Sequence, residues 1–202
     1  MRSVSEAIAA RRSVRRFAAR PVDPELVREL VALACTAPAP HHSRPWRFVN
    51  VASRAGRERL AEAMAEAWLA DLQQAGRPVQ EVDRLLRRSR GQILEAPALV
   101  LSCLVLDQAK EWPDARRAAA ERDMFMQSLG AALQNILLAA GERGLAGYLK
   151  GAPLFCAGAV RQALDLPPGW EPAFLALLGY TNGGATAAAR EPVDAADFLL
   201  ER

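Results

Sequence analysis

The spacing of apolar residues along the chain predicts a mixture of helices and strands. Between residues 24 and 34, leucines recur at the spacing of one helical face, directly after a strong helix start at Asp23. Residues 115–142 continue such a pattern over a much longer helix. Residues 99–106 are instead nearly all apolar, which is typical of a strand buried on both faces. Helices and strands do not alternate strictly, so we predict an α+β fold rather than a doubly wound sheet.

Weaker patterns complete the expected order of elements. Ser3 and Glu6 form a capping box before a short helix that ends near Arg12, and residues 13–17 alternate as an extended segment. Residues 56–92 contain two amphipathic helices, which make a lid over a pocket plausible. The remaining predictions are strands at 46–51, 145–149 and 174–178, a helix at 153–164 and a tail over 180–202. The chain contains no internal repeat or linker, so we expect residues 1–202 to form a single domain.

The composition narrows the class of protein. Hydrophobic residues make up 51% of the chain, which fits a folded domain rather than a disordered one. The net charge of +3 comes almost entirely from arginines that are spread along the sequence, so we do not expect nucleic-acid binding. The first residues lack the apolar region of a signal peptide, and the longest apolar run, 96–106, is too short to span a bilayer. We therefore expect a cytoplasmic protein that does not bind membranes.

The cysteines and histidines predict neither a disulfide framework nor a metal site. Cys35, Cys103 and Cys156 form no C-x-x-C pair and lie among apolar neighbours. The adjacent His41 and His42 have no acidic residue or cysteine nearby at ligand spacing. This pattern is more typical of loop residues that shape a pocket.

Two segments could bind an anionic, flat ligand. The run Arg11-Arg12-Ser13-Val14-Arg15-Arg16 offers planar donors that suit phosphate, although the same run is also typical of a solvated basic turn. Gly151 and Ala152 follow a predicted strand, where two small residues either let backbone N–H groups approach a ligand or form an ordinary turn. Neither G-x-G-x-x-G nor a Walker A loop is present, so Rossmann and P-loop nucleotide sites are not supported.

The order of several short motifs resembles the nitroreductase family. Residues 11–17 match its R-R-S-x-R-x-F motif, and residues 37–48 resemble the family's loop that ends in Pro-Trp-x-Phe. Gln134-Asn135 and Leu178-Gly179-Tyr180 match later signatures. The resemblance implies a three-layer sandwich in which helices flank a central, mainly antiparallel sheet. It also implies an intertwined homodimer and FMN as the cofactor.

The resemblance further implies roles for individual positions. The arginine run would hold the FMN phosphate, the ribityl chain and the pyrimidine edge, and a tail arginine would add a second phosphate contact. Backbone groups after the strand would lie against N5, and the proline-rich loop would come from the second subunit. The residues implied for FMN are Arg11, Arg12, Ser13, Arg15, Pro38, Ala39, Pro40, His42, Gly151, Ala152 and Arg190.

Within the family, segments 37–45, 119–125, 155–156 and 165–167 resemble the C-terminal reductase domain of the bifunctional coenzyme F420 biosynthesis protein. This likeness implies FMN-dependent reduction of dehydro coenzyme F420-0, with His41, Arg44 and Arg47 available to an anionic substrate. Two alternatives remain open: a general NAD(P)H-dependent nitro or quinone reductase, and a non-catalytic flavin or deazaflavin binder. The sequence assigns no side-chain acid or base.

Overall fold

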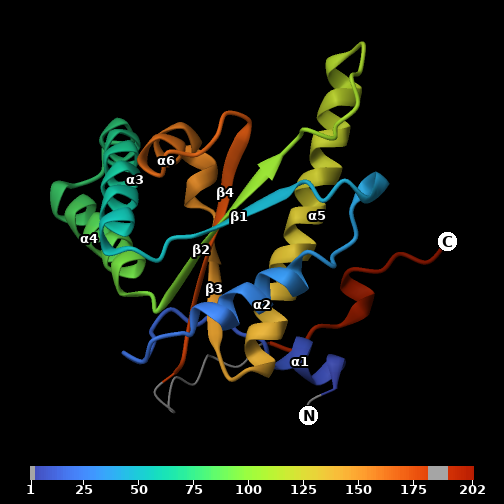
Figure 1. The fold of residues 1–202 in the computed structure, drawn as a ribbon, viewed down its shortest axis with the longest axis horizontal. Coiled ribbons are helices and arrows are strands. Elements are labelled where there is room, and N and C mark those ends of the chain that lie inside the picture. The colour runs from blue at the N-terminus through green and yellow to red at the C-terminus, as the bar shows by residue number, and fades with distance from the viewer. Residues whose placement is uncertain (1–2, 182–190) are drawn as a thin grey trace.

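The computed structural model describes residues 3–181 and 191–202 and contains a four-stranded sheet with helices on both faces (Figure 1). The strand order is β1-β2-β4-β3, and each neighbouring pair is antiparallel. The strands are β1 (Trp46–Asn50), β2 (Ala98–Val105), β3 (Ala146–Lys150) and β4 (Trp170–Gly179). The predicted α+β sandwich around an antiparallel sheet is confirmed.

The two central strands, β2 and β4, divide the hydrophobic core into two halves. Along β2, Leu99 and Leu101 pack into one core cluster, whereas Val100 and Leu104 pack into the other. Successive side chains of a strand point to opposite faces, so a strand covered on both faces must be apolar throughout. The apolar run that predicted this strand therefore has a direct structural cause.

Three helices lie on one face of the sheet or at its end. These are α1 (Val4–Ala10), α2 (Pro24–Ala34) and α5 (Ala115–Glu142). The capping box at Ser3 is confirmed, and the Asp23 carboxylate accepts a hydrogen bond from the Glu25 amide, as expected of a cap. The central helix α5 has the predicted bounds and buries its apolar stripe against α2, β3 and β2.

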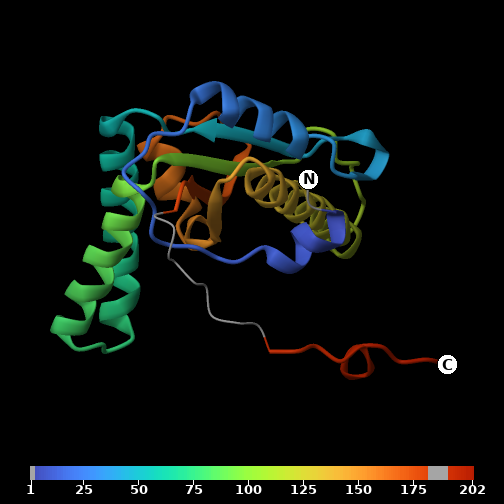
Figure 2. The ribbon, with the colours of Figure 1, turned by 90° about the horizontal axis from the view of Figure 1, so that it is seen from below.

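The other face is covered by α3 (Arg54–Gln74), α4 (Val79–Glu95) and α6 (Ala157–Ala163). The first two form a helical pair that extends beyond the sheet (Figure 2), which confirms the helices predicted within 56–92. The prediction of one helix over 153–164 was wrong. A short 3-10 turn (Ala152–Phe155) comes first, and Cys156, with φ −138°, separates it from α6.

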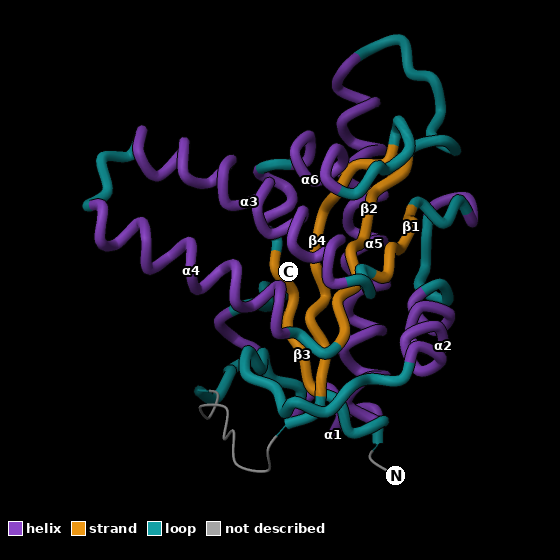
Figure 3. The backbone as a smooth tube through the Cα atoms, turned by 60° about the vertical axis from the view of Figure 1, so that its left-hand side comes forward, coloured by secondary structure: helices purple, strands orange, loops and turns teal. Residues whose placement is uncertain are grey.

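The loop between α1 and α2 crosses the end of the sheet where β3 begins (Figure 3). Ser13 forms an isolated parallel bridge with Gly147, and the Val14 amide donates to the Gly147 carbonyl at 3.1 Å. The alternating pattern predicted an extended segment, and the structure joins it to β3 by this single bridge. At the other end of the chain, residues 191–202 lead away from the sheet and contain a 3-10 turn (Ala195–Asp197) (Figure 2). Among the described residues, no helix has the length and apolar character needed to cross a membrane.

Candidate functional site

A cavity of about 1120 Å³ lies between α1, α5 and the start of β3. Arg11 and Arg12 line it from the end of α1, and Asn135 lines it from α5. Gly147 contributes from β3, at the position that pairs with Ser13. The predicted phosphate-binding arginines are thus beside a space large enough for a cofactor.

Arg12 is held in place by the end of α1. Its Nη1 donates to the Ala9 carbonyl at 2.6 Å and to the Arg11 carbonyl at 3.1 Å. Carbonyls at the last turn of a helix lack intrahelical partners and favour a nearby cation. Arg12 therefore caps the last turn of α1 at the rim of the cavity, and its contact with FMN stays a prediction.

Arg15 lies farther along the same segment and meets β3 at a buried tyrosine. Its guanidinium carbon is 5.3 Å from the centre of the Tyr148 ring. Tyr148 is 4% exposed, and its hydroxyl has no hydrogen-bond partner among the described residues. Burial raises the pKa of Tyr148 to about 12, although the charges of Arg15 and Arg88 act in the opposite direction.

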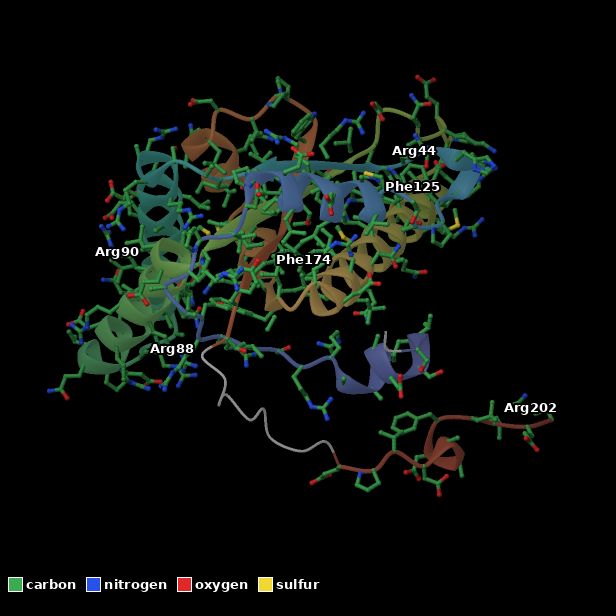
Figure 4. All side chains as sticks on the ribbon, turned by 60° about the horizontal axis from the view of Figure 1, so that its bottom comes forward. Arg44, Arg88, Arg90, Phe125, Phe174 and Arg202 are labelled. Atoms are coloured by element: carbon green, nitrogen blue, oxygen red, sulfur yellow. The ribbon has the colours of Figure 1, made fainter. Side chains whose placement is uncertain are left out.

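Gly151 and Ala152 follow β3 directly, as predicted. A Cβ on Gly151 would lie 3.2 Å from the ring of Phe174, a residue labelled in Figure 4. A side chain at this position would therefore press on the Phe174 ring of β4, which would have to shift by a few tenths of an ångström. This physical reason differs from the ligand contact that the sequence suggested.

The predicted substrate loop lies elsewhere in the structure. Residues 38–44 contain a short 3-10 turn (Pro40–His42) that contacts α5, and the segment ends at Arg44, which is labelled in Figure 4. His41, His42 and Arg44 all have φ between 48° and 56°, a left-handed conformation that costs free energy in non-glycine residues. The cavity beside Arg11 includes none of residues 38–44.

Arg47 is already engaged by its own chain. Its Nη2 lies 3.2 Å from a carboxylate oxygen of Asp107, and its Nη1 donates to the Trp46 carbonyl at 2.8 Å. A substrate anion would have to compete with these partners. Arg44 has no such ion pair among residues 3–181 and 191–202, which makes it the better placed of the two arginines.

These residues together suit a cofactor that combines negative charge with a flat ring. Arginines at the cavity supply donors for phosphate, and the unpartnered Tyr148 hydroxyl beside Arg15 can donate to a polar ring edge. FMN contains both a phosphate and such an edge, so the donor set fits it.

Comparison with known proteins agrees with this geometry. A sequence profile described as the nitroreductase family matches residues 8–180. The chain belongs to the nitroreductase family. As a member of this family it is an FMN-dependent oxidoreductase, as the motifs predicted.

Individual relatives span most of this nitroreductase-family chain. It is 32% identical over 170 residues to the 5,6-dimethylbenzimidazole synthase of Rhodospirillum rubrum, covering 83% of this chain and 76% of that protein. A BluB-like flavoprotein from Clostridium difficile 630 shares the fold with a TM-score of 0.79 over 100% of both chains, at 21% identity. The FMN-dependent nitroreductase NfnB from Mycobacterium smegmatis, solved in complex with NADPH, gives 0.74 over 98% of this chain and 97% of that one, at 19% identity.

The structure also adds residues that the sequence did not single out for a role. Asn135 was part of a matching motif, but only the fold shows that it lines the cavity. Tyr148 and Arg88 carried no sequence signal, because an isolated tyrosine in a strand and an arginine in a basic helix are ordinary. The predicted phosphate contact of Arg190 falls outside the described residues.

Proposed function

We propose that this enzyme uses electrons from NAD(P)H to reduce a small anionic acceptor, and that it works as a homodimer. The observation that carries the proposal is the position of the arginine segment. Ser13 is paired with Gly147, which places Arg11 and Arg12 at the cavity and Arg15 at Tyr148 along one continuous edge. A phosphate-bearing, flat cofactor lying along this edge would meet a cation at either end.

The homodimer is supported by what one protomer leaves incomplete. The loop 38–42, predicted to contact FMN, is not part of the cavity beside Arg11. The segment 191–202 exposes large apolar side chains, including Phe198 at 80% and Leu200 at 73% exposed. Apolar residues that one chain leaves in water are typical of a surface covered by another chain. A second copy would cover them and bring its loop 38–42 to the cofactor.

The chain's own groups have separate tasks in this proposal. Bound FMN supplies the redox chemistry, since it takes up two electrons from the donor and passes them to the acceptor. Arg11 and Arg12 bind the phosphate, and Arg15 places positive charge at the pyrimidine edge. The paired segment of residues 13–14 fixes these groups on the sheet, so that little rearrangement is needed when the cofactor binds.

Dehydro coenzyme F420-0 is the acceptor that we propose first. It carries phosphate and carboxylate groups, and the loop at residues 41–44 offers two histidines and Arg44 in a strained, exposed conformation. Strained backbone in an exposed loop is often kept for function. If this loop binds the acceptor, Arg44 is the group that recognises its negative charge.

A second candidate comes from the relatives. The similarity to a 5,6-dimethylbenzimidazole synthase, at 32% identity over 83% of this chain, favours formation of that product. Other relatives are described as nitroreductases, including a 4-nitrobenzoate reductase from Nocardioides that is 28% identical. General nitro or quinone reduction is therefore the third candidate activity.

A single set of assays separates these activities. Purified protein should be yellow, and with FMN and NADPH it should reduce dehydro coenzyme F420-0 to the product detected by mass spectrometry. Formation of 5,6-dimethylbenzimidazole in air without added acceptor would favour the second candidate, and rapid turnover of nitrobenzoate alone would favour the third. Protein that is colourless and takes up no added FMN would contradict the flavin site.

Two substitutions test the proposed contacts. Arg11→Ala should raise the dissociation constant of FMN at least tenfold, because a charged hydrogen bond to phosphate contributes about 1.5–3 kcal/mol. Arg16→Ala is the matched control from the same run and should change the dissociation constant of FMN less than threefold.

Arg44→Gln should raise KM for the anionic acceptor and leave KM for an uncharged nitroaromatic compound unchanged. An equal effect on both acceptors would contradict its assigned role.

A further inference from the structure

The segment that carries the predicted flavin arginines is attached to the sheet at two places. Residues 11–20 form a strap that runs across the end of the sheet between α1 and α2 (Figure 3). The first attachment is the bridge between Ser13 and Gly147 on β3. The second lies at the end of β4, where the Ala18 amide donates to the Tyr180 carbonyl at 2.7 Å. The strap is therefore joined to both strands of the β3–β4 pair.

Side chains strengthen the second attachment. The guanidinium carbon of Arg20 lies 3.7 Å from the centre of the Tyr180 ring, which is a stacked cation–π contact. A Cβ on Gly179 would lie 2.9 Å from the ring of Phe17, so this ring occupies the space that the glycine leaves. Phe17 packs on the half of the core beneath α3 and α4, and Tyr180 packs on the half beneath α2 and α5. The strap is therefore held from both faces of the sheet.

Arg15 is the proposed flavin arginine that lies between the two attachments. It follows the bridge and precedes the attachment to β4, and its guanidinium carbon lies 5.3 Å from the centre of the Tyr148 ring. Arg11 and Arg12 instead precede the bridge, at the end of α1. A segment fixed at both ends has fewer conformations than one fixed at a single end, so it loses less entropy when a ligand binds. The second attachment therefore acts on Arg15 and not on the phosphate end.

We propose that Arg20 and Tyr180 are positioning residues of the flavin site, because their stack holds Arg15 where the flavin ring binds. This inference rests on the proposed function. Neither Arg20 nor Tyr180 lines the cavity beside Arg11, so both act through the strap and not by contact with the cofactor. Without the stack, the strap beyond the bridge loses its side-chain attachment to β4, and Arg15 has to be ordered each time a flavin binds.

The test compares the binding of FMN with that of riboflavin, which lacks the phosphate. Dissociation constants for the full chain come from flavin fluorescence. Arg20→Gln and Tyr180→Leu should each raise both constants by the same factor, about threefold, which is the scale of one exposed cation–π contact. A strap that came loose along its whole length would weaken FMN more than riboflavin, because Arg11 and Arg12 would also be displaced.

A double-mutant cycle tests whether Arg20 acts through Arg15. In a protein that carries Arg15→Gln, the further substitution Arg20→Gln should change the dissociation constant of FMN by less than about 1.5-fold, because the contact that Arg20 positions is already lost. Tyr180→Phe keeps the ring and should stay within about 1.5-fold of wild type, which separates the stack from the tyrosine hydroxyl. Arg16→Gln is the matched control from the strap and should also stay within about 1.5-fold.

The outcomes separate this inference from the proposed function. Wild-type protein that binds FMN, with Arg20→Gln bound as tightly as wild type, would overturn the positioning role and leave the flavin enzyme intact. Additive effects of Arg15→Gln and Arg20→Gln, or a larger loss for FMN than for riboflavin, would also overturn it. Wild-type protein that binds neither flavin would contradict the proposed function and this inference together. Thermal unfolding of each variant identifies losses caused by misfolding, and because Arg20 is exposed, Arg20→Gln tests the stack even if Tyr180→Leu does not fold.

Discussion

Glu121 is a buried carboxylate near the start of α5, with 3% of the residue exposed. One of its oxygens accepts hydrogen bonds from the Lys110 amide at 3.0 Å and from the Trp112 indole at 2.7 Å. Hydrogen bonds to a charged group contribute more than neutral ones, and a buried donor that loses its partner is destabilising. This single side chain therefore closes the loop that joins β2 to α5.

We predict that Glu121→Ala lowers the free energy of unfolding by about 2–4 kcal/mol, since two donors lose a charged acceptor. Trp112→Phe removes one donor and should cost about 1–2 kcal/mol. In urea denaturation the double variant should lose less than the sum of the two, because both substitutions break the same bond. Strict additivity would show that the indole and the carboxylate act independently.

At the scale of elements, hydrogen bonds of two side chains hold the ends of helices in place. Arg57 on α3 donates to the Val51 carbonyl at 2.8 Å and also to the Ala96 carbonyl, which ties both ends of the α3–α4 pair to the sheet. At the other face, Asp114 caps α5 by accepting from the Arg117 amide at 2.9 Å and pairs with its guanidinium. These hydrogen bonds, first through the backbone and then through the side chain, lower the pKa of Asp114 from its ordinary 3.8.

The lowered pKa predicts a pH-dependent contribution from this cap. A carboxylate with a depressed folded-state pKa stabilises the fold above its unfolded pKa and loses that effect as pH falls through the folded value. Asp114→Asn keeps an acceptor at the cap but removes the charge. Wild type should therefore unfold at a higher temperature than Asp114→Asn at pH 7, and the gap should start to narrow near pH 3.8 and close as the pH falls through the lower folded-state pKa. In a protein that also carries Arg117→Gln, the substitution Asp114→Asn should lower the unfolding temperature at pH 7 by less. An unchanged difference would contradict the ion pair between Asp114 and Arg117.

At the scale of the whole molecule, the exposed apolar residues of 191–202 and the separation of loop 38–42 from the cavity both require a second copy in our proposal. We predict that the double variant Phe198→Ser with Leu200→Ser shifts sedimentation toward monomer at micromolar concentration, whereas Glu201→Ser does not. The affinity for FMN should fall as the dimer dissociates, because the loop 38–42 of the second copy would no longer reach the cofactor. A monomeric wild type that binds FMN fully would contradict this arrangement.

Most of the elements could be predicted because their signals are local. The capping box at Ser3, the cap at Asp23 and the long apolar stripe of α5 act within a few residues of the chain, and each was predicted correctly. The strand β4 was predicted too short, since Pro172 interrupts its pattern and its first residues are defined by pairing with β2, up to Val105 with Trp170. The break at Cys156 was missed for a similar reason, because the apolar spacing continues through it.

By itself, the sequence determined the fold class and the family. Periodicity indicated the fold class, and short motifs, including the arginine run, indicated the family. Only the tertiary structure decided which of those arginines meet the sheet and what they meet there. Tyr148 comes from a strand and Arg15 from a loop, and their contact depends on pairing between segments distant in sequence. Likewise, the fold explained Gly151 by the ring of Phe174 on the neighbouring strand. Contacts between distant segments arise only when the layers pack, so no local pattern records them.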